Sequence, residues 1–213
     1  MNWIDVESKG NGKYCQTNEE HIIQHIFDNI GITNKFCVEF GAGNGSRLSN
    51  TKLLRDGGWD CLLMDAESAN PDVRKEFITA ENINKLFAKY SVPHEFDLLS
   101  IDLDGNDYWV WNAIVYKPRV VVIEYNPTWE PYERKTIVYN PNHVFDGTSY
   151  YGASIGALCD LGSKKDMNLI YYNKLNAFFV RSDALAPDCV SPILPPKRRG
   201  GWPPDLEREW VDV

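Results

Sequence analysis

The sequence predicts an α/β domain built on a mostly parallel β-sheet with helices on both faces. Short, continuous apolar runs alternate with segments of helical periodicity, which indicates strand–helix–strand units. The first apolar run, 36–40, leads into a turn in which alternate residues are glycine. Two later runs, 169–172 and 177–180, are close enough in sequence to form an antiparallel hairpin. We therefore expect a seven-stranded sheet, closed at one edge by this hairpin.

Helices are predicted where apolar residues recur three and four positions apart. Residues 19–30 place Ile22, Ile26 and Phe27 at this spacing, and Gly31 is a natural stop. Further helices are expected at 51–56 (capped by Ser49 or Asn50 and ended by Gly57 and Gly58), at 82–90, at 108–114 and at 154–161 (ended by Gly162).

Strands are predicted at the continuous apolar runs, because strands covered on both faces have no polar side. The parallel strands are expected at 36–40, 61–64, 75–79, 96–101 and 120–125, of which 75–79 has the weakest pattern. The carboxyl ends of parallel strands meet at one edge, so their terminal residues should share one cleft. These residues are Glu39, Asp65 or Glu67, Glu81, Asp102 with Asp104, and Glu124 with Asn126.

Composition and charge restrict the kinds of partner. The 213 residues carry a formal net charge of −8, which argues against a nucleic-acid backbone as the main partner. The one basic run, Lys197–Arg199, is short. No apolar stretch approaches the ~20 residues needed to cross a bilayer, so no membrane partner is expected.

The N-terminus and the cysteines indicate a cytoplasmic protein. No basic segment followed by an apolar run marks a secretory signal at the start of the chain. The five cysteines show no C-x-x-C pairing, which fits reduced thiols.

The turn after the first strand is the strongest functional signal. Glycines at 41, 43 and 45 allow positive φ and close approach of the backbone to a ligand. A dinucleotide fingerprint would need a glycine at position 46, where the chain has Ser46. The spacing E-x-G-x-G-x-G instead resembles the nucleoside-binding turn of class I S-adenosylmethionine-dependent methyltransferases. The residues predicted to bind the cofactor here are Glu39, Gly41, Ala42, Gly43, Asn44 and Gly45.

Acidic residues at two further strand ends are candidates for the nucleoside. A carboxylate after the second strand can accept hydrogen bonds from both ribose hydroxyls, and Asp65, followed by Ala66, is the first choice, with Glu67 as the second. Glu81 and Asn82 are predicted to bracket the adenine. A plain exposed acid at a strand end remains the alternative for Asp65 and Glu67.

The segment Asp102-Leu-Asp-Gly-Asn-Asp107 is dense in acids and has three interpretations. It is a loop of turn-forming residues, or it places Asp102 beside the cofactor or substrate, or Asp102, Asp104 and Asn126 hold a divalent cation. The second interpretation is preferred. A divalent cation is therefore considered, but no metal site is predicted.

Residues 126–149 are predicted to form a long ordered loop, which suggests a lid over the cleft. Within it, Asn126-Pro-Thr-Trp129 is only partly similar to the box of amino-group methyltransferases, and with the acidic surface it does not indicate a nucleic-acid substrate. His143 is the only histidine of the loop, and His143 or Asp102 is the candidate general base. A structural or solvated histidine remains the alternative.

The chain divides into a domain at 1–182 and a proline-rich C-terminal arm at 183–213. Trp202 or Trp210 is expected to pack the arm on its own domain or on a neighbouring molecule. A homo-oligomer formed through the arm is therefore considered.

Several segments resemble one family, the FkbM-type class I methyltransferases. The matching blocks include Phe40-Gly-Ala-Gly-Asn-Gly-Ser46, Ser100-Ile-Asp-Leu-Asp-Gly-Asn-Asp107, Glu124-Tyr-Asn126, Tyr150-Tyr-Gly-Ala-Ser154 and Asn176-Ala-Phe-Phe-Val-Arg181. They cover roughly residues 10–182 and leave the proline-rich arm outside. Asn44 departs from the pattern, because relatives often carry an acid there.

The resemblance implies a Rossmann-like fold, S-adenosylmethionine as cofactor and methyl transfer to a hydroxyl of a sugar or small metabolite. The acceptor would be a small molecule or a glycan. Two other functions stay open, a nucleotide-dependent oxidoreductase and a non-catalytic binding or assembly module that grips a partner with its arm.

Overall fold

The computed structural model describes residues 12–186, 189, 191–192, 194 and 203–213. Its main sheet has seven strands in the spatial order β3-β2-β1-β4-β5-β8-β7, and β6 and β9 form a separate two-stranded sheet. The main-sheet strands are β1 (Phe36–Phe40), β2 (Asp60–Asp65), β3 (Arg74–Lys75), β4 (Glu95–Ile101), β5 (Lys117–Glu124), β7 (Met167–Tyr172) and β8 (Asn176–Arg181). The second sheet consists of β6 (Lys135–Ile137) and β9 (Trp210–Asp212).

Most of the main sheet is parallel, as the sequence predicts. β1 pairs in parallel with β2 and β4, and β4 pairs in parallel with β5. β8 runs antiparallel to both β5 and β7. The protein is therefore a mixed α/β protein with a Rossmann-like arrangement, closed at one edge by the predicted hairpin.

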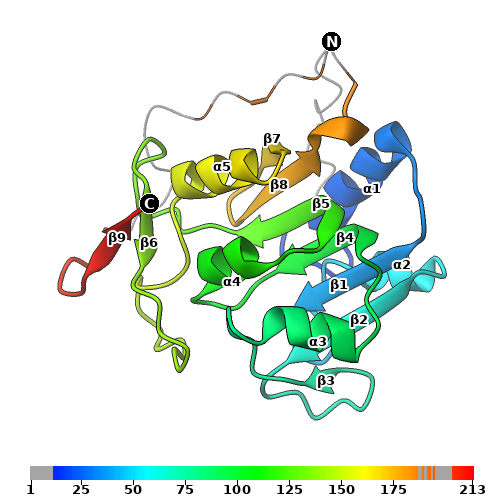
Figure 1. Cartoon of the computed structure of the whole chain (residues 1–213), viewed down its shortest axis with the longest axis horizontal. Helices are drawn as coiled ribbons and strands as arrows, with labels where there is room; N and C mark the ends of the chain where they lie inside the picture. The colour runs from blue at the N-terminus through cyan, green and yellow to red at the C-terminus, as the bar shows by residue number, and fades with distance from the viewer. Residues whose placement is uncertain (1–11, 187–188, 190, 193, 195–202) are drawn as a thin grey trace.

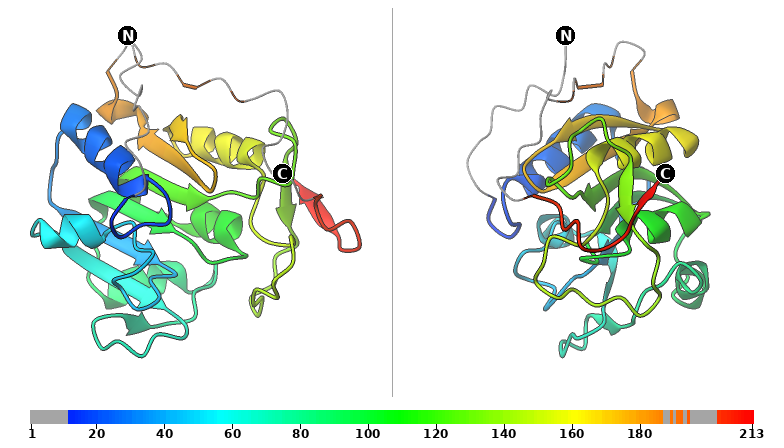
Figure 2. Two further views of the ribbon diagram at one scale, coloured as in Figure 1. Left: turned by 180° about the vertical axis from the view of Figure 1, so that it is seen from behind. Right: turned by 90° about the vertical axis from the view of Figure 1, so that its left-hand side faces the viewer.

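The described helices are α1 (Glu19–Ile30), α2 (Lys52–Asp56), α3 (Ile83–Lys89), α4 (Asp107–Ala113) and α5 (Ile155–Lys164). They cover both faces of the main sheet (Figures 1 and 2). On one face α1 packs Ile22 and Phe27 against the strands. On the other face Phe87 of α3, Trp111 of α4 and Leu158 of α5 belong to a single larger cluster. None of the described helices has both the length and the apolar character needed to cross a membrane.

β5 shows why the strand sequences are apolar without interruption. Val120 and Val122 pack in the cluster beneath α1, whereas Val121 and Ile123 pack in the cluster beneath α3, α4 and α5. Successive side chains of a strand point to opposite faces, so a strand covered on both sides needs apolar residues at every position. The polar ends of such strands are left at the sheet edge, where a site can form.

Three predicted element boundaries are wrong. β3 is only two residues long, Arg74–Lys75, and does not extend over 75–79. α5 continues through Gly162 to Lys164, so this glycine does not end the helix. A Cβ at Gly162 would lie 2.8 Å from the ring of Phe179, so the residue is small because the helix packs closely on the sheet. The N-cap of α2 is Thr51, without a side-chain cap, in place of Ser49 or Asn50.

The described end of the C-terminal arm returns to the 126–149 loop of the same chain. β9 pairs antiparallel with β6, beyond the carboxyl edge of the main sheet (Figure 1). The ring of Trp210 meets those of Trp129 and Tyr150 edge-on, at centroid distances of 5.0 and 5.1 Å. Of the alternatives predicted for the arm, the structure shows Trp210 packed on its own chain, and Trp202 lies outside the described residues.

A buried carboxylate fastens the connection between α1 and β1 to the sheet. Asp97 of β4 accepts hydrogen bonds from the backbone N–H groups of Thr33, Asn34 and Lys35 at 2.9 to 3.0 Å, and from Arg119 at 2.9 Å. Arg119 also donates to the carbonyls that end α1. Burial alone raises the pKa of Asp97, but the hydrogen bonds from Thr33 and Arg119 outweigh it, and the pKa lies below its ordinary value.

Loss of the Asp97 charge should destabilise the fold. We expect Asp97→Asn to lower the free energy of unfolding by about 3 kcal/mol in urea at pH 7, because it leaves Arg119 buried beside a neutral partner. The native carboxylate stabilises fully above its unfolded pKa of about 4, and this contribution is lost as pH falls through the lower folded value. The difference in free energy of unfolding between the native protein and the variant should therefore become smaller below about pH 4. Asp60→Asn, at an exposed position, is the control, and an equal loss in both variants would contradict the assignment.

Truncation of Trp210 should release the 126–149 loop without unfolding the domain. We expect Trp210→Ala to speed amide hydrogen exchange in β6 about tenfold, equivalent to about 1.4 kcal/mol, since β9 would lose its aromatic contacts. Exchange in β4 should stay unchanged. Leu206→Ala removes a side chain of the arm that is 73% exposed and serves as the matched control. Equal exchange in the two variants would show that Trp210 does not hold the loop.

Candidate functional site

A cavity of about 310 Å³ opens at the carboxyl edge of the main sheet, where β1, β2 and β4 end. Five residues predicted for the site line it, namely Gly41, Asp65, Ala66, Asp102 and His143. They come from the turn after β1, the end of β2, the loop after β4 and the 126–149 loop. The remaining lining residues are Glu67, Glu76, Phe77, Ile78, Leu103, Asp104, Asn106, Val144 and Phe145.

The turn after β1 needs glycine at Gly41 and leaves open space at Gly43. A Cβ at Gly41 would lie 1.9 Å from the carbonyl oxygen of Asp102, and the residue has a φ of +62°, so only glycine fits. Gly43 also has a positive φ, +51°, but no described atom lies within 4 Å of the place its Cβ would take. Gly41 therefore allows the ends of β1 and β4 to lie close together, whereas Gly43 leaves open space beside its backbone.

The remaining predicted residues of the turn stabilise it and do not line the cavity. Ala42 donates its N–H to a carbonyl of β2 at 3.2 Å. The side-chain oxygen of Asn44 accepts from the N–H groups of Ser46 and Arg47, at 2.9 and 3.0 Å. Gly45 packs between side chains of the β2 region. Of the predicted turn residues, only Gly41 lines the cavity, and Ala42, Gly43, Asn44 and Gly45 do not.

Glu39 points into the protein and not into the cavity. Its buried carboxylate accepts hydrogen bonds from the hydroxyls of Ser49 and Thr51 and from the N–H of Asn50, at 2.5 to 2.8 Å. Burial raises the pKa of Glu39, and these hydrogen bonds act against the rise. The hydroxyls of Ser49 and Thr51 donate to this carboxylate, which explains why neither side chain caps the N-terminus of α2. Glu39 holds the start of α2 against β1.

Asp65 is where the prediction and the geometry agree best. Its Oδ2 accepts from the N–H of Gly43 at 2.9 Å, and its Oδ1 accepts from the N–H of Glu67 at 2.8 Å. A carboxylate has about four lone-pair sites, so both oxygens can accept further hydrogen bonds from the cavity. Asp65 both holds the glycine turn and offers acceptors to a ligand.

Glu81 and Asn82 are not among the residues that line the cavity. Glu81 is paired with the hydroxyl of Tyr139, and Asn82 hydrogen-bonds Thr79 and Phe77 within its own loop. The structure instead brings Phe77 and Ile78 to the cavity, on the segment after β3. In the sequence, Phe77 and Ile78 stand out only as an apolar pair, and the pattern assigns them to the interior of the strand predicted at 75–79.

Three carboxylates lie close together at the ends of β4 and β5. One oxygen from each of Asp102, Asp104 and Glu124 lies within 4.8 Å of the others. Burial, followed by the charges of Asp107 and Asp104, raises the pKa of Asp102 to about 8. Burial and then the charge of Asp102 raise the pKa of Glu124 well above its ordinary value. Mutual repulsion in a poorly solvated place is typical of functional sites.

Asp107 braces the loop that carries two of these acids. Its carboxylate accepts from the N–H of Leu103 at 2.8 Å and from the N–H of Gly105 at 2.9 Å. Burial raises the pKa of Asp107 to about 6. Asp104, at the exposed tip of the loop, has a positive φ of +51°. Asp107 thus has a structural role within the predicted acidic segment.

The structure does not support Asn126 as a partner of the acids in the cation alternative. Its Nδ2 donates to the carbonyls of Ser149 and Tyr151 at 2.9 and 2.8 Å, and its Oδ1 accepts from the N–H of Thr128 at 2.9 Å. The amide is thereby committed to the 126–149 loop and its neighbours. Glu124 takes its place beside Asp102. The sequence places Glu124 among the strand-end residues expected to share the cleft, but the cation alternative named Asn126 and not Glu124 beside Asp102 and Asp104.

The 126–149 loop brings His143 to the acid loop. A Cβ at Gly105 would lie 2.2 Å from Cδ2 of His143, so the imidazole packs on the backbone of the glycine. Desolvation raises the pKa of Asp104, and His143 acts in the opposite direction through its charge. The Nε2 atom of His143 is buried without a hydrogen-bond partner among the described residues. Both predicted candidates for a general base, His143 and Asp102, therefore line one cavity.

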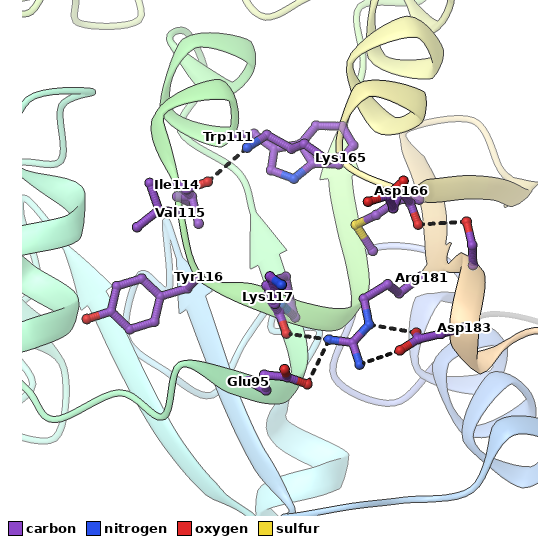
Figure 3. A pocket seen from close by; sticks show the side chains of 13 residues that line it. Glu95, Trp111, Ile114, Val115, Tyr116, Lys117, Lys165, Asp166, Arg181 and Asp183 are labelled. Atoms are coloured by element: carbon purple, nitrogen blue, oxygen red, sulfur yellow. Dashed lines mark hydrogen bonds and ion pairs between the residues drawn. The ribbon is translucent and has the colours of Figure 1, made fainter.

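A second cavity, of about 470 Å³, lies at the opposite edge of the sheet and holds none of the predicted residues. Figure 3 shows the guanidinium of Arg181 between the carboxylates of Glu95 and Asp183. The ammonium of Lys165 donates to the carbonyl of Ile114 at 2.8 Å. Arg181, Glu95, Asp183 and Lys165 thus already have partners within the chain, and none of the predicted residues lies here, so the carboxyl-edge cavity is the candidate site.

Comparison with known proteins adds no relative. No protein-family model matches the sequence, and a search of curated proteins finds no match. The resemblance to FkbM-type methyltransferases therefore rests on the sequence blocks, and the geometry of the site must carry the functional proposal.

Two alanine variants should separate the roles of the glycines. Gly43→Ala should cost about 1 kcal/mol of unfolding free energy, from the positive φ alone. Gly41→Ala should cost about 3 kcal/mol or more, because the new methyl group also overlaps the carbonyl of Asp102. Urea denaturation of both variants measures the difference. Equal costs would mean that β1 and β4 do not approach as closely at Gly41 as described.

Proposed function

We propose that the protein is an S-adenosylmethionine-dependent methyltransferase that methylates a hydroxyl of a sugar or another small metabolite. The observation that carries the proposal is that the turn at Gly41, the carboxylate of Asp65 and the acidic loop at Asp102 line one cavity. The resemblance of the sequence blocks to FkbM-type enzymes points to the same cofactor.

The fold is compatible with this proposal. The strand order β3-β2-β1-β4-β5-β8-β7 with one antiparallel strand, β8, is the arrangement expected for class I methyltransferases. In open α/β sheets, ligands bind outside the carboxyl ends of the strands where the strand order reverses. Here the order reverses between β1 and β4, and the cavity lies at that point.

The charge of the cavity favours a cationic ligand. Five acids line it, and no Lys or Arg occurs among its described lining residues. The acids are Asp65, Glu67, Glu76, Asp102 and Asp104. Glu76 is already paired with Lys89, and the other acids, where ionised, attract a positively charged donor and repel the pyrophosphate of a dinucleotide. This observation supports the methyltransferase over a nucleotide-dependent oxidoreductase.

Each part of the cavity has a role in this proposal. Asp65 accepts hydrogen bonds from the ribose hydroxyls, and Phe77 and Ile78 provide apolar surface for the base. When bound, the donor supplies a methyl group on a positively charged sulfur, which becomes a neutral thioether as the methyl passes to the acceptor oxygen. His143 or Asp102 takes the hydroxyl proton. The protein otherwise contributes alignment of the two reactants.

Calorimetric titration with S-adenosylhomocysteine and with NAD tests the proposal. We expect one S-adenosylhomocysteine to bind per chain and NAD to give no heat of binding. Asp65→Ala should weaken binding about tenfold or more, because the ribose loses charge-assisted hydrogen bonds. Asp60→Asn, at the far end of β2, is the control and should bind normally. Binding of NAD alone would overturn the methyltransferase proposal, and full affinity in Asp65→Ala would remove Asp65 from the site.

A further inference from the structure

The three converging carboxylates form a second candidate site beside the cavity, which Asp102 and Asp104 line. Asp102 and Asp104 belong to the loop after β4, and Glu124 ends the adjacent parallel strand β5. One oxygen from each lies within 4.8 Å of the other two. Two oxygens bound to the same cation at 2.0 to 2.6 Å lie at most about 4 to 5 Å apart. The three side chains are therefore already close to the spacing of a coordination shell.

The hydrogen bonding of Glu124 provides an observation independent of the spacing of the acids. The Oε2 atom of Glu124 is buried and has no hydrogen-bond partner among the described residues. A buried acceptor without a donor is costly, and a carboxylate more so than a neutral group. In the described part of the chain, neither Lys nor Arg lines the cavity to supply the missing charge. Apart from His143, whose charge acts on Asp104, no described lining residue can supply the cluster with a positive charge.

We propose that Asp102, Asp104 and Glu124 bind one divalent cation. Three carboxylate oxygens suit a hard ion such as Mg²⁺, Mn²⁺ or Ca²⁺, which prefers oxygen ligands. Asp104 is the most exposed of the three and gives the ion access from solvent. Asp102 and Asp104 line the cavity, so an ion held by them would be accessible to water or to oxygens of an acceptor. The assignment does not depend on methyl transfer.

The competing explanation is that the acids hold protons. A carboxyl group can remain neutral beside a second acid and then donate a hydrogen bond to it. Protons would remove the repulsion without any ion, and in that case an added cation would not compete at micromolar to millimolar concentration. A metal titration therefore distinguishes the two explanations directly.

The test is a titration of the full chain with Mn²⁺ alone, after treatment with a chelator, in which the electron paramagnetic resonance signal of free Mn²⁺ is followed. We expect one Mn²⁺ to bind per chain with a Kd below about 1 mM. Glu124→Gln and Asp104→Asn should each weaken binding about tenfold or more. Asp60→Asn removes one charge at the amino end of β2 and should leave binding unchanged. Circular dichroism verifies that each variant is folded.

Absence of saturable Mn²⁺ binding in the native chain would overturn the proposal. Unchanged affinity in both Glu124→Gln and Asp104→Asn would also overturn it, since the ion would then bind elsewhere. S-adenosylhomocysteine is titrated separately on the same preparation. If it binds and Mn²⁺ does not, the cation site alone is refuted, whereas binding of Mn²⁺ without S-adenosylhomocysteine refutes only the methyltransferase.

Discussion

The close approach of two strand ends, β1 and β4, is the constraint on which the candidate site depends. The turn at Gly41 passes so near the carbonyl of Asp102 that no side chain fits between them. β1 and β4 are paired in register, so this contact also determines where the acid loop begins. Asp65 then holds the other side of the turn through the N–H of Gly43. The backbone of this turn and the carboxylates of Asp65 and Asp102 therefore lie together at one cavity.

The sequence was sufficient for those site residues whose position follows from strand direction. Asp65 and Asp102 lie together because the carboxyl ends of parallel strands share an edge. Glu39 satisfies the same rule but turns inward, since three donors at the start of α2 surround it. Glu81 is held by Tyr139, which lies 58 residues further along the chain. Contacts over such distances leave no local pattern, so the sequence could not show which strand-end acids would face the cavity.

The contact between the 126–149 loop and the C-terminal arm is another long-range contact that the sequence could not show. β6 and β9 are three residues long, which is too short for an alternating pattern to stand out from a loop. Their pairing joins segments far apart in the sequence, and Trp210 secures it by packing on Trp129 and Tyr150. The functional consequence is that the arm, outside the segments that resemble the methyltransferase family, supports the loop that delivers His143. The tryptophans of the arm predicted that it packs on its own domain or on a neighbour, but the sequence did not show its pairing with β6.

Charge connects the two proposals made for this cavity. Acids brought together with little solvent either take up protons or bind a cation, and their repulsion weakens the fold until one of these occurs. Such a cluster costs stability, and perturbed acids in a cavity are typical of sites that bind a ligand. The cationic donor and a divalent ion are both ligands that negative charge attracts, but they would bind at different places. The donor would lie along the turn and Asp65, whereas the ion would lie between Asp102, Asp104 and Glu124. Because the turn at Gly41 contacts the backbone of Asp102, the two ligands would lie next to each other but be held by different side chains.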